Sequence, residues 1–194
     1  YNEIGVSMLA KRLSISFIFS LTLVGMLSGC GNSTTPSIDS VDSTSSNKII
    51  DDGILVTSPS QFAEKSTSLK PGDTLVLANG EWKNFEILFK GKGSKDKPIT
   101  LKAETKGKVI LTGLSNLRLS GEYLVVEGLV FKNGYSPTGE VISFSENSDV
   151  LANHSRVTEV VIDGFSNPDK FNSDYWVGMY GKNNRFDHNH LVGK

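Results

Sequence analysis

From about residue 74 onward, the apolar residues fall into short runs that glycine and asparagine interrupt. Runs such as "ITLKAE", "VILTGL", "YLVVEGLVFKNG" and "VTEVVIDGFSN" alternate or are rich in β-branched residues, and they end at turn signals. This pattern is typical of β-strands. After about Lys70, the sequence shows no amphipathic helical periodicity. The sequence therefore predicts an all-β domain.

Two all-β architectures fit such a pattern: a sandwich or barrel of antiparallel hairpins, and a parallel β-helix in which each coil stacks on the previous one. An approximate internal repeat favours the β-helix. The triplets EGL (127–129), DGF (163–165) and DHN (187–189) recur at spacings of 36 and 24 residues. With coils of about 20–25 residues, one coil then carries an insertion, for which "NPDKFNSDY" (167–175) is a candidate.

One helix is predicted at the start of this domain. Ser58 offers a capping hydroxyl, and Pro59 follows at the first helical position. Phe62, Ala63 and Leu69 can line one face of a helix that begins near Ser58 and ends near residue 67. The first coil of a β-helix has no preceding coil to cover its inward side chains, so we expect this helix to cap it.

The first fifty residues have a different composition. Residues 1–7 precede the first methionine and are interpreted as an upstream stretch outside the native protein. Residues 8–29 have the pattern of a secretory signal peptide, with two basic residues before an apolar run of about 14 residues. That run is shorter than the roughly 20 residues of a membrane-spanning helix. Residues 30–50, rich in Ser and Thr, are predicted to be a flexible tether before the folding domain, residues 51–194.

The "LSGC" stretch at residues 27–30 resembles the lipobox of bacterial lipoproteins. The resemblance implies cleavage before Cys30 and lipid on its thiol and new amino terminus. Cys30 is the only cysteine in the chain, so disulfides do not stabilise it. Gly31 after the cysteine is typical, within lipoproteins, of sorting to the outer membrane. We therefore expect an exported lipoprotein at the outer membrane, on the cell surface or in the periplasm; the alternative is a free cysteine in an ordinary signal peptide.

The charge balance argues against a nucleic-acid partner. The whole chain has 20 basic and 21 acidic residues, and its formal net charge is −1. From Cys30 onward two basic residues and one acidic residue drop out, which leaves 18 basic and 20 acidic residues. A nucleic-acid-binding domain would carry a clear basic excess.

The stretches "LANGEW", "KGKGSKDKPITLKAE", "GEYLVVEGLVFKNG" and the closing "NNRFDHNHLVGK" resemble the first coils of polysaccharide lyase family six, the group of chondroitinase B-like and alginate lyases. The resemblance covers roughly Leu55 to Lys194. It implies a right-handed parallel β-helix and β-elimination on a uronate-containing polysaccharide, with alginate as the favoured substrate. It also implies calcium held by acidic and amide side chains, a lysine base and an arginine acid.

In the family, those catalytic and calcium-binding residues lie on coils after the "NRFDHNHLVGK" stretch. This sequence contains no stretch that matches them, so we expect the catalytic residues and the calcium ligands beyond Lys194. The chain is then the N-terminal part of a longer enzyme and is expected to be inactive alone. One alternative is a non-catalytic β-helical module that binds a glycan or a protein. Another is a β-helix hydrolase, which would show clustered aspartates on later coils.

The closing stretch is the densest polar segment, and it supplies the candidate site residues. Two histidines spaced by two residues on a strand share a face, so His188 and His190 suggest metal ligands beside Asp187. Without a third histidine or cysteine nearby, this metal signal is weak, and a polar solvent-exposed face is the favoured interpretation. Strict alternation from Phe186 would carry both histidines inward unless the chain bends near Asn189.

Substrate contact is the second interpretation of this stretch. An anionic uronate polymer along the coils would meet cations, and arginine can pair a carboxylate through two parallel hydrogen bonds. Arg185, His188, His190 and Lys194 are the predicted substrate-binding residues, with ordinary surface charge as the alternative. Trp176 and Tyr180 suggest either a sugar-stacking platform or core packing.

Overall fold

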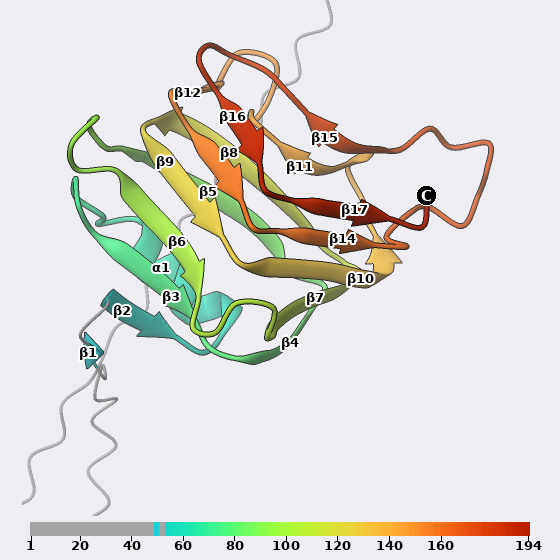
Figure 1. Ribbon diagram of the computed structural model, residues 1–194, viewed down its shortest axis with the longest axis horizontal. Helices are drawn as coiled ribbons and strands as arrows, with labels where there is room; N and C mark the ends of the chain where they lie inside the picture. Colours follow the sequence, from blue (N-terminus) through green and yellow to red (C-terminus); the bar gives the residue numbers. More distant parts are fainter. Residues whose placement is uncertain (1–48, 51–52) are drawn as a thin grey trace, which may run out of the picture. The chain divides into compact units, whose positions relative to one another are not determined.

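The computed structural model describes residues 49–50 and 53–194, and these residues form a parallel β-helix (Figure 1). The chain passes in turn through three sheets, here called A, B and C, and then begins the next coil. Every strand pair in the three sheets is parallel except the antiparallel pair β1–β2. The predicted all-β class and the parallel β-helix are confirmed.

Each sheet collects strands from successive coils. Sheet A consists of β1 (Ile49–Ile50), β2 (Gly53–Val56), β3 (Thr74–Leu77), β6 (Ile99–Ala103), β9 (Leu124–Glu127), β13 (Arg156–Thr158) and β16 (Arg185–Asp187). Sheet B consists of β4 (Gly80–Lys83), β7 (Val109–Leu114), β10 (Leu129–Tyr135), β14 (Val161–Asp163) and β17 (His190–Val192). Sheet C consists of β5 (Glu86–Lys92), β8 (Asn116–Glu122), β11 (Glu140–Ser143), β12 (Ala152–Asn153) and β15 (Tyr175–Gly178).

The length of each coil is given by one column of inward-facing residues in sheet A, in which each residue pairs with the next in register. Its members, stacked in register, are Leu75, Leu101, Val126, Val157 and Phe186. Successive coils therefore contain 26, 25, 31 and 29 residues. The later coils are longer than predicted because loops interrupt them, among them the segment from Gly164 to Asp174 between β14 and β15. That segment contains the predicted insertion.

The three triplets were predicted to occupy the same position in successive coils. This is right for two of them and wrong for the third. Glu127 stacks on Thr158, which stacks on Asp187, so the first and last triplets occupy one corner. Asp163 lies instead in sheet B and pairs with Val192. Glycine follows strands at more than one corner of the coil, so a glycine triplet does not reveal which sheet has just ended.

The core is a single column of apolar side chains between the three sheets. In β6, Ile99 and Leu101 are fully buried, whereas Thr100 and Lys102 are partly exposed, as expected for alternating faces. The largest fully buried side chains are Phe89, Phe131, Phe144 and Phe165. Burying one such side chain contributes about 1.5–3 kcal/mol, so the stacking of coils is the main source of stability.

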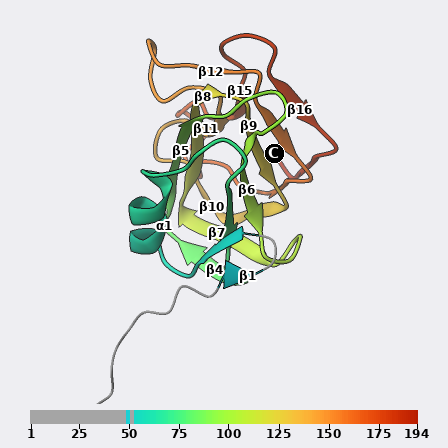
Figure 2. The ribbon, with the colours of Figure 1, turned by 90° about the vertical axis from the view of Figure 1, so that its left-hand side faces the viewer.

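Helix α1 (Pro59–Ser66) begins as predicted. The Ser58 hydroxyl accepts a hydrogen bond from the Gln61 backbone N–H at 3.3 Å, and Pro59 occupies the first turn. Phe62 is buried and meets the Phe85 ring edge-on, with 5.4 Å between the ring centroids. Because Phe85 lies between β4 and β5, the helix packs against the first coil; Figure 2 shows it beside the early strands and away from the last ones.

The predicted upstream stretch, the signal peptide and Cys30 lie outside the described residues. Where the structure does describe the chain, no helix is both long and apolar enough to cross a membrane.

Candidate functional site

The closing stretch bends at His188. This residue has a φ of +58°, and Gly128 and Glu159 occupy the same corner of earlier coils with φ values of +80° and +57°. The bend is one residue earlier than expected and separates sheet A from sheet B. His188 therefore lies at a corner, whereas His190 is an exposed residue of β17 beyond it. The two histidines do not share the face of one strand.

Asp187 is the centre of a charged cluster on sheet A. Arg156, one coil earlier, holds it with two parallel bonds, Nε to Oδ1 at 2.7 Å and Nη2 to Oδ2 at 2.8 Å. Arg185 Nη2 and His188 Nδ1 lie 3.0 and 2.7 Å from Oδ2. Hydrogen bonding to Arg156 first, and then to His188, holds the pKa of Asp187 well below its usual range. The cluster ties the last coil to the preceding one, and it already engages two of the predicted substrate-binding residues.

Asp187→Asn should lower the melting temperature at neutral pH. A carboxylate with a depressed folded pKa contributes stability above its unfolded pKa of about 3.9 and loses it as pH falls through the folded value. The difference between wild type and variant should therefore be full near pH 7 and shrink below about pH 4. Thermal melts across this range measure it. The control is Asp163→Asn, an exposed carboxylate on sheet B; an equal loss there would contradict the assignment.

Lys194 lies away from this cluster. Its Nζ donates to the Asp174 carbonyl oxygen at 2.6 Å, lies 3.4 Å from Asp174 Oδ1, and is 5.4 Å from the Trp176 ring centroid. Trp176 is partly buried, and its Nε1 donates to the Phe165 carbonyl at 2.7 Å. Trp176 thus packs against the core rather than forming an open platform. The four predicted substrate-binding residues are consequently spread over three places.

The geometry of the described residues does not fit a bound cation. Within residues 53–194, no three His, Cys, Asp or Glu side chains are placed to hold a metal ion together. Asp187, the acid that the sequence suggested, is instead saturated by two guanidinium groups and an imidazole. We therefore derive no catalytic step through calcium from these coils.

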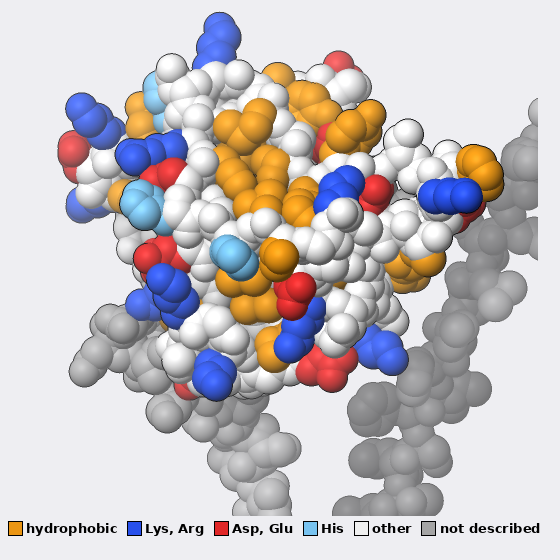
Figure 3. Space-filling view, turned by 45° about the vertical axis from the view of Figure 1, so that its right-hand side comes forward, with side chains coloured by type: hydrophobic (Ala, Val, Ile, Leu, Met, Phe, Trp, Pro, Cys, Tyr) orange, Lys and Arg blue, Asp and Glu red, His pale blue; other side chains and the backbone are white. Residues whose placement is uncertain are grey.

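The last strand of sheet B has exposed apolar residues on both faces, since Leu191 pairs in register with the buried Ile162 and Val192 with the exposed Asp163. Leu191 and Val192 of β17 are 40% and 44% exposed. Figure 3 shows hydrophobic side chains gathered in the middle of one face of the molecule, with charged side chains around them. Hollows with polar lining lie elsewhere, one on sheet B with Glu81, Lys83 and Lys132 in its lining and others beside sheet C.

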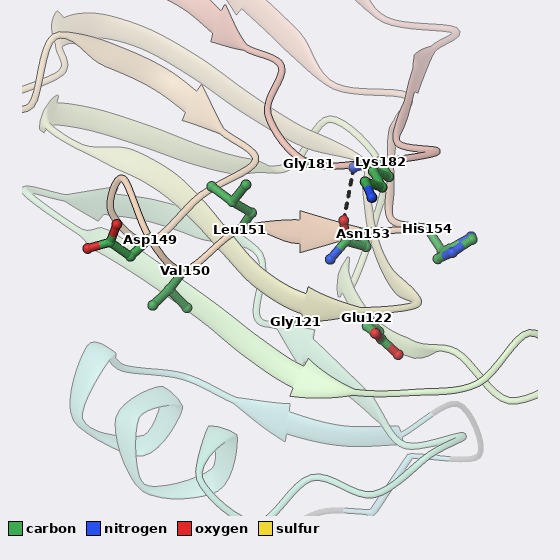
Figure 4. A pocket seen from close by; sticks show the side chains of 9 residues that line it. All are labelled: Gly121, Glu122, Asp149, Val150, Leu151, Asn153, His154, Gly181 and Lys182. Atoms are coloured by element: carbon green, nitrogen blue, oxygen red, sulfur yellow. Dashed lines mark hydrogen bonds between the residues drawn. The ribbon is translucent and has the colours of Figure 1, made fainter.

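A hollow of about 760 Å³ lies beside the loop between β11 and β12 (Figure 4). Val150 and Leu151 form an apolar side, and Asn153, His154 and Lys182 form a polar one. The backbone N–H of Lys182 donates to Asn153 Oδ1 at 2.9 Å. This size and mixed lining are those of small-ligand pockets in general.

His154 is a corner residue between β12 and β13. Its φ is +51°, and its ring stacks on Tyr123 of the previous coil with 4.8 Å between centroids. Tyr123 has a φ of +53° and occupies the corresponding corner between sheets C and A. The two stacked rings lie at the edge of the 760 Å³ hollow, which His154 lines.

A second hollow of about 460 Å³ lies across Leu151 from the first. It is lined by Glu140, Ser145, Asn147, Ser148, Leu151 and Tyr180. The Tyr180 hydroxyl donates to Glu140 Oε1, and this bond to a carboxylate raises the pKa of Tyr180. The sequence pointed to Tyr180 but missed Glu140, because only the stacking of β11 on β15 brings the two together.

The fold defines a parallel β-helix protein, with open hollows of mixed polar and apolar lining beside sheet C. The chain belongs to the chondroitinase B family, whose model matches residues 56–194. The solved neighbours place this family match among the polysaccharide lyases of family six, as the sequence resemblance indicated.

Three solved structures illustrate the similarity. The family-six alginate lyase AlyGC is 63% identical, with a TM-score of 0.70 over 71% of this chain. A mannuronic acid-specific family-six lyase from human gut microbiota is 36% identical, with a TM-score of 0.65 over 72% of this chain. The family-six lyase from Pseudopedobacter saltans is 35% identical, with a TM-score of 0.57 over 71% of this chain. The matched region spans 19%, 34% and 36% of those proteins. No curated protein matches the sequence.

Proposed function

We propose that the chain is the N-terminal part of an exported polysaccharide lyase that cleaves alginate by β-elimination. The observation that carries this proposal is the 63% identity to a solved alginate lyase over 71% of the chain. A further family-six alginate lyase, 25% identical over 70% of the chain, was solved with a trisaccharide. Both relatives are described as alginate lyases, and alginate is a polymer of uronates. An acidic polysaccharide is therefore the proposed partner.

β-Elimination on a uronate requires a base, an acid and a positive charge near the substrate carboxylate. A base removes the proton on C5 of a uronate, the C4–O bond breaks, and a C4–C5 double bond forms as an acid protonates the leaving oxygen. Negative charge spreads into the carboxylate and needs a cation to stabilise it. Calcium, when bound, supplies such a charge. In the described coils Arg156 and Arg185 are held by Asp187, so they do not offer a free guanidinium for this task.

We therefore propose that the base, the acid and the calcium ligands lie on coils beyond Lys194. The matched region's 19% share of the alginate lyase AlyGC supports this, since most of that protein has no counterpart here. The coils of residues 53–194 would then provide the base of the stack and hold the polymer. The resemblance of residues 27–30 to a lipobox supports a lipid anchor on Cys30, and Gly31 after it supports a place at the outer membrane.

Ultraviolet absorbance of the unsaturated product tests the proposal. The full reading frame should generate this signal on alginate, with dermatan sulfate as the comparison substrate, and the 194-residue chain should generate none on either. In cells, Cys30→Ala should move the full-length protein out of the membrane fraction without changing its activity.

Two outcomes would change the assignment. Activity of the 194-residue chain would place the catalytic residues among the described coils. A full reading frame that binds alginate without cleaving it would favour the second candidate, a β-helical glycan-binding module, for which the hollows on sheet C are the supporting observation.

A further inference from the structure

The smaller hollow on sheet C, here called the Glu140 hollow, has the chemistry of a sugar-binding site. It comprises Glu140, Ser145, Asn147, Ser148, Leu151 and Tyr180 around a volume of about 460 Å³. Its lining combines a carboxylate, hydroxyls, an amide and a phenol with one apolar side chain. Pyranose rings present hydroxyls at their edges and C–H groups on their faces, so they need both kinds of partner in one place.

Glu140 is held in a fixed position at this hollow. One carboxylate oxygen accepts the Tyr180 hydroxyl. The carboxylate also lies over Gly178 of the next coil, so closely that a Cβ at Gly178 would overlap it. An acceptor that is already ordered loses little side-chain entropy when a ligand binds. Glu140 is therefore preorganised rather than mobile at the surface.

Two exposed tyrosines flank this carboxylate. Tyr180 lines the hollow and is 44% exposed. Tyr175 lies beside the hollow, where it pairs in register with Glu140 across β11 and β15, and is 61% exposed. Tyrosines present a large apolar ring and a polar tip at low cost in conformational entropy, which makes them suited to binding sites. Their position beside a fixed acceptor offers ring contact and hydrogen bonding together.

The loop over the hollow is ordered by its own side chains. Asn147 Oδ1 accepts the backbone N–H groups of Asp149 and Val150 at 2.9 and 3.0 Å. Ser145 Oγ lies 2.9 Å from Ser143 Oγ on β11, and this bond joins the base of the loop to sheet C. These hydrogen bonds therefore fix the side of the hollow that carries the serine hydroxyls.

The charge at the hollow decides which part of a uronate can enter. In the stretch from Gly53 to Lys194, no Lys or Arg forms an ion pair with Glu140. A sugar carboxylate facing Glu140 would meet an uncompensated like charge. Sugar hydroxyls, in contrast, can donate charge-assisted bonds to it. The hollow therefore favours the hydroxyl edge of a sugar and excludes its carboxylate.

We propose that the Glu140 hollow is a subsite for one residue of the uronate polymer, with sugar hydroxyls on Glu140 and the sugar ring against Tyr175 and Tyr180. This inference rests on the proposed function, because the polymer's identity comes from the family. The subsite positions the chain and performs no chemistry. It lies on the coils described here, apart from the catalytic residues proposed to lie beyond Lys194.

Titration of the 194-residue chain with an alginate tetrasaccharide tests the subsite, because this chain is expected not to cleave its ligand. Calorimetry or NMR shift changes measure the dissociation constant. Glu140→Gln and Tyr175→Ala should each weaken binding about tenfold, the effect of losing a charge-assisted hydrogen bond or an aromatic contact. Tyr180→Phe removes the bond that orders Glu140 and should weaken binding less than Glu140→Gln does.

The controls match each change in kind. Glu64→Gln removes a carboxylate on α1 that is 68% exposed, and Phe171→Ala removes an aromatic ring that is 86% exposed; neither lines the hollow nor pairs in register with Glu140. Both should bind like wild type. The melting temperature of every variant establishes that it is folded, and Tyr175→Ala, at an exposed position, keeps the test open if Glu140→Gln does not fold.

The outcomes separate this inference from the proposed function. A wild type that does not bind the tetrasaccharide, or folded Glu140→Gln and Tyr175→Ala variants that bind unchanged, would overturn the subsite. If the full reading frame still cleaves alginate in that case, the lyase assignment stands alone. If binding depends on Glu140 but the full reading frame cleaves nothing, the subsite stands and the lyase assignment falls.

Discussion

Replacing Phe131 with alanine should destabilise the folded chain by about 3–5 kcal/mol. Phe131 is fully buried in β10, in the middle of the stack, and its ring meets Phe165 of the next coil edge-on with 5.6 Å between centroids. Removal of the ring leaves a cavity between two coils whose backbones are fixed by parallel ladders on both sides. Because the surrounding strands cannot collapse into this space, the loss should lie near the upper part of the range.

Urea unfolding monitored by circular dichroism measures this loss. The control is Phe171→Ala, since Phe171 is 86% exposed on the loop before β15, and its change should stay within about 0.5 kcal/mol. Equal destabilisation by the two substitutions would contradict the assignment of the core. An unchanged slope of the unfolding curve with Phe131→Ala would show that the loss is one of stability alone.

The sequence predicted the fold well because local signals and stacking agree. The Ser58–Pro59 pair marks the start of α1, and the run at 167–175 marks a real excursion between β14 and β15. Both signals depend only on neighbouring residues. Short strands that end at glycine or asparagine, together with an approximate repeat, favour a parallel β-helix. The family resemblance implied the same architecture.

The register between coils could not be predicted in the same way. The distance from Glu127 to Asp187 spans two coils of 31 and 29 residues, whereas the sequence suggested 36 and 24. Loop insertions change the length of each coil independently, and glycine marks several corners. A sequence pattern therefore indicates that coils repeat but does not give the register partner of any residue.

The residues that meet in the candidate site could not be predicted from the sequence for the same reason. His188 and His190 are two residues apart in sequence, but His188 forms the left-handed corner between sheets A and B, whereas His190 lies in β17 of sheet B. Glu140 and Tyr175 are 35 residues apart and meet in register. Dense polar residues in one stretch are thus a poor guide to a site in a β-helix, because residues that meet on a face come from successive coils.

Substitution of Gly121 by alanine should destabilise the chain by about 3 kcal/mol or more. Gly121 lies at the end of β8, where its φ is +110°, a conformation that side chains other than glycine rarely adopt. Its neighbour in register on the previous coil is Gly91. A Cβ at Gly121 would overlap the Gly91 carbonyl oxygen, so the two coils would have to separate at this corner. Backbone strain and steric overlap both act against the variant.

The matched control separates these two causes. Gly80 has a φ of +134°, yet a Cβ there would meet no atom within 4 Å. Gly80→Ala should therefore cost only the strain of its backbone conformation, about 1–3 kcal/mol. The excess loss with Gly121→Ala then measures how closely the coils approach at the corner between sheets C and A. Equal losses at the two positions would mean that the coils can separate there without cost, and would contradict the close stacking that holds the hollows of sheet C in place.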